Sequence, residues 1–275
     1  MFKNVQKDQL HAMLTFSIPL ALLLGSACGG KGAEDSKLGD IYKNDVQTRH
    51  KATPEERAWV VNVGGCSGSM LNAKLLLTAN HCQPQVGARY TTGAASNVGR
   101  SQDLVVERVA EANSQIDFSI VEVKWQSGAP TPGQKYTPFI STKASDLVFG
   151  RDGVGSKLFT VGFPVDKNSW GATYAEGYAK KYEDNYMLYN VGSINGNSGG
   201  AVWRAQDKML VGQTNFGPHS HGQPGWDNNE PENPAAWNGG GAMYKALQAS
   251  ATLRDIFPNG NNRFVDDNGN LEAFD

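Results

Sequence analysis

The side chains of His81, Asp117 and Ser198 are the ones in this chain best suited to nucleophilic chemistry. A serine hydroxyl becomes an effective nucleophile when a neighbouring histidine removes its proton. The histidine in turn needs a carboxylate on its other ring nitrogen, which fixes the tautomer and stabilises the cation. The order along the chain, His then Asp then Ser, is one of three unrelated orders that assemble this geometry. We therefore predict His81 as the base, Asp117 as its orienting carboxylate and Ser198 as the nucleophile.

The loop around Ser198, residues 196–200, reads Gly-Asn-Ser-Gly-Gly. Glycines on both sides of the serine allow a tight turn and the close approach of a substrate. We expect the backbone amides of Gly196 and Ser198 to form an oxyanion hole. The loop also satisfies Gly-x-Ser-x-Gly, the nucleophile turn of α/β-hydrolases. That fold places its acid and histidine after the serine and needs regular helices, whereas this chain alternates strands and turns, so chain order excludes it.

The segments that carry the base and the acid both look like ends of buried strands. His81 alone among the five histidines follows an apolar strand candidate, residues 74–78. Asp117 heads the apolar run 118–123, where a charged side chain is expected to face a partner rather than the core.

Composition favours an all-β protein. The 275 residues include 32 glycines and 12 prolines, and short β-branched runs alternate with turns. A formal net charge of -2 without a long basic stretch gives no reason to expect a nucleic-acid partner. Residues 217–241 are expected to form an irregular loop and residues 242–253 a helix. The strand candidates are residues 59–65, 74–78, 104–109, 118–123, 157–162, 185–190, 201–203 and 209–214.

The N-terminus is typical of an export signal, residues 1–27. Lys3 and Lys7 precede an apolar run over residues 13–24, which small residues follow. A run of about a dozen residues is shorter than the roughly 20 needed to span a membrane. We therefore expect an exported protein, which would be periplasmic, held at the cell surface by lipid, or secreted.

The three cysteines have two different contexts. Cys66 and Cys82 flank a predicted buried strand, and an exported protein favours a disulfide between them. Cys28 directly follows the signal, and residues 28–32 resemble the lipid-bearing start of bacterial lipoproteins. We expect lipidation at Cys28 and lipid-mediated membrane anchoring. Cleavage after Ala27 by the general signal peptidase is the alternative, and it would give a free secreted protein.

From about residue 41 to 257 the chain resembles the trypsin-like (chymotrypsin-fold) serine proteases, in particular the bacterial branch that includes the glutamyl endopeptidases. The resemblance rests on the histidine segment 78–82, on Asp117 and on Ser198 in its glycine-rich loop. It implies an all-β fold of two antiparallel six-stranded β-barrels with the active site in the cleft between them, followed by a short C-terminal helix. The predicted division of the chain is a signal at 1–27, a tether or pro-segment at 28–40, barrels at 41–145 and 146–257, and a tail at 258–275.

The resemblance also implies a specificity pocket. Its walls would be Gly192 and Ser193 on one side, and on the other Thr214, Asn215, Phe216 and Gly217. Gly192 stands where a basic-specific enzyme has an aspartate, so a preference for Arg or Lys has no support. Thr214 stands where glutamyl endopeptidases have a histidine, so the pocket departs from the acid-specific pattern as well.

The expected function is therefore that of a serine endopeptidase, a hydrolase that acts on protein or peptide substrates as a monomer. No cofactor and no metal is expected, because His219 and His221 have no third ligand at a recognisable spacing. The alternative is a non-catalytic binding or adhesion protein on the same double-barrel scaffold.

Overall fold

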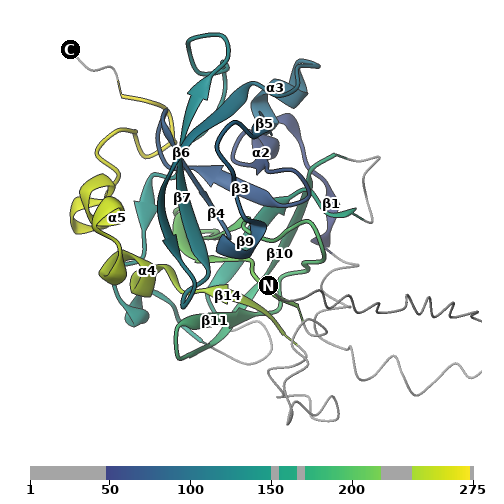
Figure 1. Cartoon of the computed structure of the whole chain (residues 1–275). Coiled ribbons are helices and arrows are strands. Elements are labelled where there is room, and N and C mark those ends of the chain that lie inside the picture. The colour runs from purple at the N-terminus through teal and green to yellow at the C-terminus, as the bar shows by residue number, and fades with distance from the viewer. Residues whose placement is uncertain (1–47, 150–154, 166–170, 218–236, 273–275) are drawn as a thin grey trace, which may run out of the picture.

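The computed structural model describes residues 48–149, 155–165, 171–217 and 237–272, which form two β-barrels around a shared core (Figure 1). The signal, Cys28 and the tether lie outside the described residues. The two-barrel prediction is confirmed.

The first barrel is closed and antiparallel, with the strand order β2-β3-β4-β7-β6-β5. Its strands are β2 (Val61–Asn62), β3 (Ser67–Met70), β4 (Leu75–Thr78), β5 (Arg89–Thr92), β6 (Leu104–Asn113) and β7 (Phe118–Trp125). Short helices α2 (Pro54–Arg57) and α3 (Gly93–Asn97) accompany them. Strand β4 is buried inside the sheet, because it pairs with β3 on one side and with β7 on the other. The Asn72 side chain starts β4 by accepting hydrogen bonds from the Lys74 and Leu75 amides.

The second barrel consists of six consecutive antiparallel strands. They are β9 (Lys157–Gly162), β10 (Thr173–Glu183), β11 (Tyr186–Tyr189), β12 (Ala201–Arg204), β13 (Met209–Gln213) and β14 (Asn238–Gly241). A bridge between Gly212 and Ala242 brings β13 next to β14 and closes the ring. Two short strands add to it: β8 (Phe139–Ile140) runs parallel to β13, and β1 (His50–Lys51) pairs with β10.

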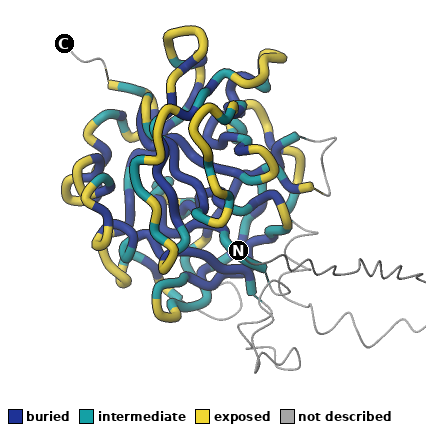
Figure 2. Tube along the Cα trace, viewed as in Figure 1, coloured by how far each residue is buried: buried dark blue, intermediate teal, exposed yellow. Residues whose placement is uncertain are grey.

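Aromatic side chains join the two barrels. Trp203 of β12 is fully buried, stacks on Phe159 at 5.2 Å between ring centroids and meets Trp59 edge-on at 6.1 Å. The same cluster contains Leu77 and Phe118, the strand residues that lead to and from the predicted acid–base pair. Figure 2 shows this buried interior with exposed turns around it. The shared core therefore fixes the ends of β4 and β7 against the second barrel.

The C-terminal segment has two helices where one was predicted. They are α4 (Met243–Ala249) and α5 (Ala251–Ile256), followed by the 3-10 turn η5 (Pro258–Gly260). The break falls at Ser250, which has an extended backbone and whose side-chain oxygen accepts a hydrogen bond from the Leu253 amide at 3.0 Å. Further on, the buried Asn262 side chain donates to the Leu71 and Thr137 carbonyls, so this segment packs onto the first barrel.

Two other predicted elements are also wrong in part. The strand candidate 59–65 is reduced to β2, because Trp59 follows helix α2. Strand β14 lies within the segment 217–241 expected to be irregular, of which residues 218–236 are outside the described part.

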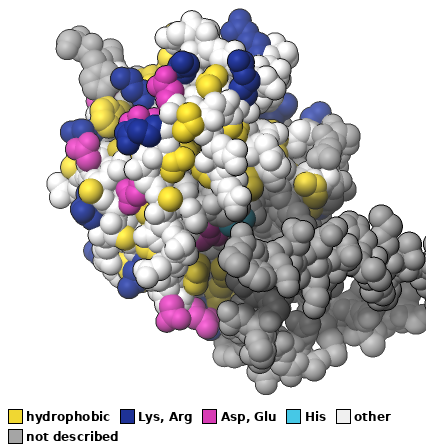
Figure 3. Space-filling model, viewed as in Figure 1, with side chains coloured by type: hydrophobic (Ala, Val, Ile, Leu, Met, Phe, Trp, Pro, Cys, Tyr) yellow, Lys and Arg dark blue, Asp and Glu magenta, His cyan; other side chains and the backbone are white. Residues whose placement is uncertain are grey.

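Two properties of the surface complete the description. None of the helices in the described ranges is long and apolar enough to span a membrane. On the face shown in Figure 3, basic and acidic side chains are interspersed rather than gathered by sign.

Candidate active site

His81 sits in a short turn at the end of strand β4. This 3-10 turn, η1 (Asn80–Cys82), starts two residues after Thr78 ends the strand. A disulfide between Cys66 and Cys82, with 6.2 Å between the Cα atoms, fastens the turn to the segment entering β3. The His81 side chain is 44% exposed, so its ring stands at the surface and is reachable from solvent.

Asp117 meets His81 through both carboxylate oxygens. Its Oδ2 lies 2.6 Å from His81 Nδ1, and its Oδ1 accepts from the His81 backbone amide at 2.9 Å. The backbone of Asp117 has φ +62°, a left-handed conformation that costs energy for a residue other than glycine. This strained turn immediately before β7 aims the carboxylate back at the imidazole. Since a carboxylate only accepts, Nδ1 carries the proton and Nε2 is left with a lone pair.

Asn215 holds Asp117 from the second barrel, a role that the sequence did not reveal. Its Nδ2 donates to Asp117 Oδ2 and to the Asp117 carbonyl, both at 2.7 Å. Its Oδ1 accepts from the Gly241 amide at 2.9 Å. We predicted Asn215 only as a wall of the specificity pocket, because no local pattern marks an amide that bonds to a residue 98 positions away.

These contacts move the pKa values of the pair in opposite directions. The hydrogen bond to Asp117 raises the pKa of His81 above its ordinary value, although partial burial works against this. Burial alone would raise the pKa of Asp117, but hydrogen bonds from His81 and Asn215 outweigh it and hold that pKa below the ordinary value. The carboxylate therefore stays ionised at neutral pH, where it favours a proton on His81.

The loop that carries Ser198 packs directly on the His81 segment. The Ser198 carbonyl accepts from the Ser67 amide at 2.7 Å and lies 3.7 Å from the Cys82 sulfur. Gly199 has φ +82°, and a Cβ on it would lie 2.6 Å from the Ala79 backbone nitrogen. Only glycine permits this close approach. The structure thus places the Ser198 loop against the turn that carries His81.

Two amides of this loop point away from the protein's own acceptors. The carbonyls of Asn195 and Asn197 accept backbone N–H bonds at 2.9 and 2.8 Å. Because a trans peptide is planar with N–H opposite C=O, the amides of Gly196 and Ser198 in the same planes face the other side. Within the described ranges neither amide donates to an acceptor. Two unpaired donors on either side of Asn197 are the elements of an oxyanion site.

A family model for the trypsin-like peptidase domain matches residues 66–212, more than half of the 275-residue chain. The chain belongs to the trypsin-like peptidase family. It is therefore a serine endopeptidase, a hydrolase of peptide bonds.

Among solved structures, this trypsin-like peptidase is similar to a Glu endopeptidase in complex with MPD. The TM-score is 0.50 at 19% identity, over 76% of this chain and 94% of the other. At this identity the likeness concerns the fold. Comparison with curated protein sequences found no significant match.

A small pocket of about 50 Å³ opens beside Ser198 in the trypsin-like peptidase. Five of the six residues predicted for the specificity pocket line it, and Gly192 does not. The lining residues are Ser193, Ile194, Asn195, Ser198, Thr214, Asn215, Phe216 and Gly217. The buried Tyr189 hydroxyl donates to Thr214 Oγ1 at 3.1 Å behind this wall, a contact that the sequence did not indicate.

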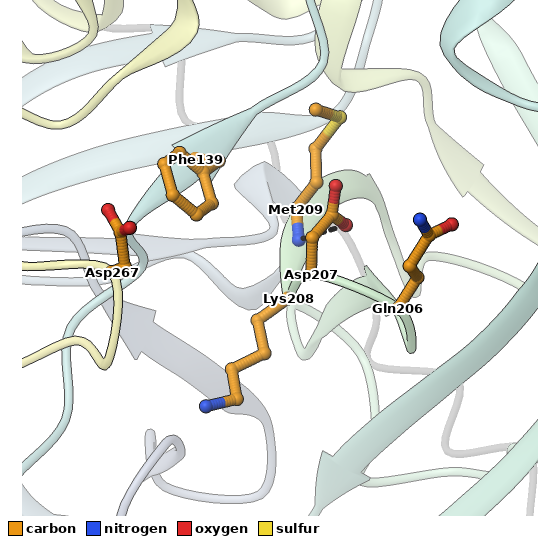
Figure 4. Close-up of a pocket in the computed structure, with 6 residues that line it drawn as sticks. All are labelled: Phe139, Gln206, Asp207, Lys208, Met209 and Asp267. Carbon is orange, nitrogen blue, oxygen red and sulfur yellow. Dashed lines mark hydrogen bonds between the residues drawn. The ribbon is translucent and has the colours of Figure 1, made fainter.

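A wider pocket of about 440 Å³ lies at the other end of strand β13, beside Met209 and the turn before it (Figure 4). Strand geometry puts it roughly 16 Å from Thr214 along β13. Two of its charged groups have partners within the described residues, since Asp207 pairs with Arg204 and the Lys208 ammonium lies 5.2 Å from the ring centroid of Trp59. Although it is the wider of the two pockets, it lies too far from Ser198 to take part in the chemistry there.

Of the residues weighed as metal ligands, His219 and His221 lie outside the described residues.

Proposed function

We propose that the chain is an exported serine endopeptidase that cleaves peptide bonds through an acyl-enzyme. Ser198 is the nucleophile, His81 the base and Asp117 the orienting carboxylate. The amides of Gly196 and Ser198 bind the oxyanion.

One observation carries the proposal: the His81 Nδ1 to Asp117 Oδ2 contact of 2.6 Å, beside a serine loop with two unpaired amides. A structural histidine would use both ring nitrogens or bury them. Here Nδ1 is committed to a carboxylate, and the side chain is still 44% exposed. This leaves Nε2 available to a group that arrives in the cleft.

The chemistry follows from these positions. Ser198 Oγ attacks the substrate carbonyl carbon while its proton passes to His81 Nε2, and Asp117 stabilises the resulting imidazolium. The carbonyl oxygen, now negative, accepts from the Gly196 and Ser198 amides, and loss of one such donor typically costs about 10²- to 10³-fold in rate. His81 then gives its proton to the leaving amine. In the second half the same base activates water to release the acyl group.

A labelled fluorophosphonate tests the proposal, because it reacts covalently with an activated serine. We expect the wild type to label at Ser198 and to hydrolyse a protein substrate, and Ser198→Ala to do neither while it keeps its melting temperature. Folded wild-type protein that binds peptides but does not label would favour the non-catalytic binding protein instead.

Export and anchoring rest on the N-terminal residues and on the disulfide. The signal-like residues 1–27 and the Cys66–Cys82 bond both suit an oxidising compartment. We propose that Cys28 carries a lipid. Detergent phase separation of cell extracts should place the wild type in the detergent phase and Cys28→Ser in the aqueous phase. Wild-type protein found wholly in the aqueous phase would exclude lipid anchoring and leave a periplasmic or secreted protein.

A further inference from the structure

The wall of the pocket beside Ser198 contains a pair of buried hydroxyls, those of Tyr189 and Thr214. Tyr189 ends strand β11 with none of its surface exposed, and Thr214 follows strand β13 with 3% exposed. The two oxygens lie 3.1 Å apart. Burial raises the pKa of Tyr189, so its hydroxyl keeps its proton at any physiological pH.

The direction of this hydrogen bond is set by what else each hydroxyl can reach. Among the residues that the structure describes, Thr214 Oγ1 is the one acceptor for the buried Tyr189 proton. A buried donor without a partner is costly, so Tyr189 donates and Thr214 accepts. The Thr214 hydroxyl proton then remains for an acceptor in the pocket that Thr214 lines. Ser193, across the same pocket, adds a second hydroxyl.

The dimensions and charge of the pocket limit what can enter. Its volume of about 50 Å³ is about a third of the roughly 150 Å³ of a cavity that accommodates benzene. Only a side chain of a few heavy atoms fits there. No Lys, Arg, Asp or Glu is among the described lining residues. A carboxylate or an ammonium group would therefore be desolvated without a counter-charge, which is costly.

We propose that this pocket selects a short, uncharged side chain with an acceptor oxygen, namely Asn, Ser or Thr, on the residue whose carbonyl is attacked. Thr214, oriented by Tyr189, donates the hydrogen bond to that oxygen. The inference rests on the proposed function, because it takes Ser198 as the attacking group. It makes Thr214 a specificity-determining residue and Tyr189 a positioning residue.

The first test compares peptide substrates that differ at this one position. The Thr and Val pair has nearly the same shape and differs by the acceptor oxygen, and the Asn and Asp pair differs by the charge. We expect kcat/KM for Thr to exceed that for Val about tenfold, the usual value of one net hydrogen bond, and Asn to be cleaved faster than Asp. Val cleaved as fast as Thr, or Asp faster than Asn, would overturn the assignment.

The second test uses variants of the pair. Thr214→Val should reduce the Thr to Val preference to about one, whereas Thr214→Ser, which keeps the hydroxyl, should retain it. Tyr189→Phe should weaken the preference about threefold, because Thr214 is no longer held. Tyr136→Phe is the matched control, since it removes a buried tyrosine hydroxyl from the first barrel and should leave the preference unchanged. A preference that survives Thr214→Val would overturn the assignment.

Fluorophosphonate labelling of the same samples separates this inference from the proposed function. Full labelling of a wild type that shows no preference overturns the pocket assignment alone. Absence of labelling in folded protein overturns the proposed function, and the pocket assignment with it.

Discussion

Replacing Asn215 by leucine tests whether Asp117 depends on the amide that holds it. Leucine keeps the approximate shape but removes the Nδ2 donor, which bonds to the Asp117 carboxylate and carbonyl, each at 2.7 Å. A hydrogen bond to a charged group contributes about 1.5–3 kcal/mol. Since the carboxylate must stabilise an imidazolium that exists only as the reaction proceeds, the loss should appear in kcat. At 1.4 kcal/mol per factor of ten, the expected decrease in kcat is roughly 10- to 150-fold. Any change in KM reports on the pocket wall, which Asn215 also lines.

The control is Asn262→Leu, because Asn262 has the same bonding pattern far from the site. Its Nδ2 donates to two carbonyls, and its Oδ1 accepts from the Phe264 amide at 3.1 Å. Both variants should lose about 1–3 kcal/mol of unfolding free energy in a denaturant titration. Only Asn215→Leu should lose kcat at a temperature where both remain folded.

A double-mutant cycle decides whether the effect passes through Asp117. In an Asp117→Ala background, Asn215→Leu should change kcat by less than about twofold, because the group that it holds is gone. The same 10- to 150-fold decrease in both backgrounds, or an equal decrease in Asn262→Leu, would refute the reasoning.

Three further predictions concern the acid–base pair, the Ser198 loop and the disulfide. Activity requires neutral His81, and Asp117 raises the pKa of His81, so kcat/KM should fall with decreasing pH through an apparent pKa above 6.5. Asp117→Asn should move this acidic limb of the pH profile to lower pH. A limb that does not move would contradict the pairing. Gly199→Ala should cost more than about 3 kcal/mol of stability, because its Cβ would lie 2.4 Å from a backbone carbonyl oxygen. The control Gly128→Ala, with the same φ of +82° and nothing within 4 Å, should cost about 1 kcal/mol. Equal melting temperatures for the two variants would contradict this. The Cys66–Cys82 disulfide spans 16 residues, so replacing both cysteines by serine should lower the unfolding free energy by about 3 kcal/mol in denaturant titrations. An unchanged midpoint would mean that the bond does not form.

The sequence predicted the structure best where a buried apolar strand leads to or from a residue with a chemical role. Strands β4, β7 and β9 read as apolar runs, and the structure has them within a few residues of the predicted bounds. His81 and Asp117 stand at the ends of two of these strands, which pair directly with each other. Their proximity was expected from the motif order and the resemblance to the trypsin-like proteases, and the pairing of β4 with β7 brings it about.

Strand β10 was missed for a physical reason. Its inward positions are small, as at Ala175, Gly177 and Ala179, because the barrel interior has little room there. A Cβ at Gly177, for example, would lie 2.6 Å from the Val191 amide nitrogen. The outward positions are aromatic or charged, so the usual contrast between apolar interior and polar exterior is lost. Strand β14, with three consecutive glycines, was missed for the same reason.

Side-chain contacts between residues far apart in the sequence were the other part that the sequence could not supply. The bond from Asn215 to Asp117 joins the two barrels, and the bond from Tyr189 to Thr214 lies within the second barrel. Nothing local distinguishes these side chains from solvated ones. Only the packing of the folded chain gives them their partners.

The central claim, that Ser198 becomes acylated, is tested most directly by a rapid-mixing experiment with a p-nitrophenyl ester. An acyl-enzyme should release a burst of one p-nitrophenol per active protein, followed by slower turnover. We predict that burst for the wild type and none for Ser198→Ala. A Ser198→Ala protein that still gives a stoichiometric burst would contradict the account.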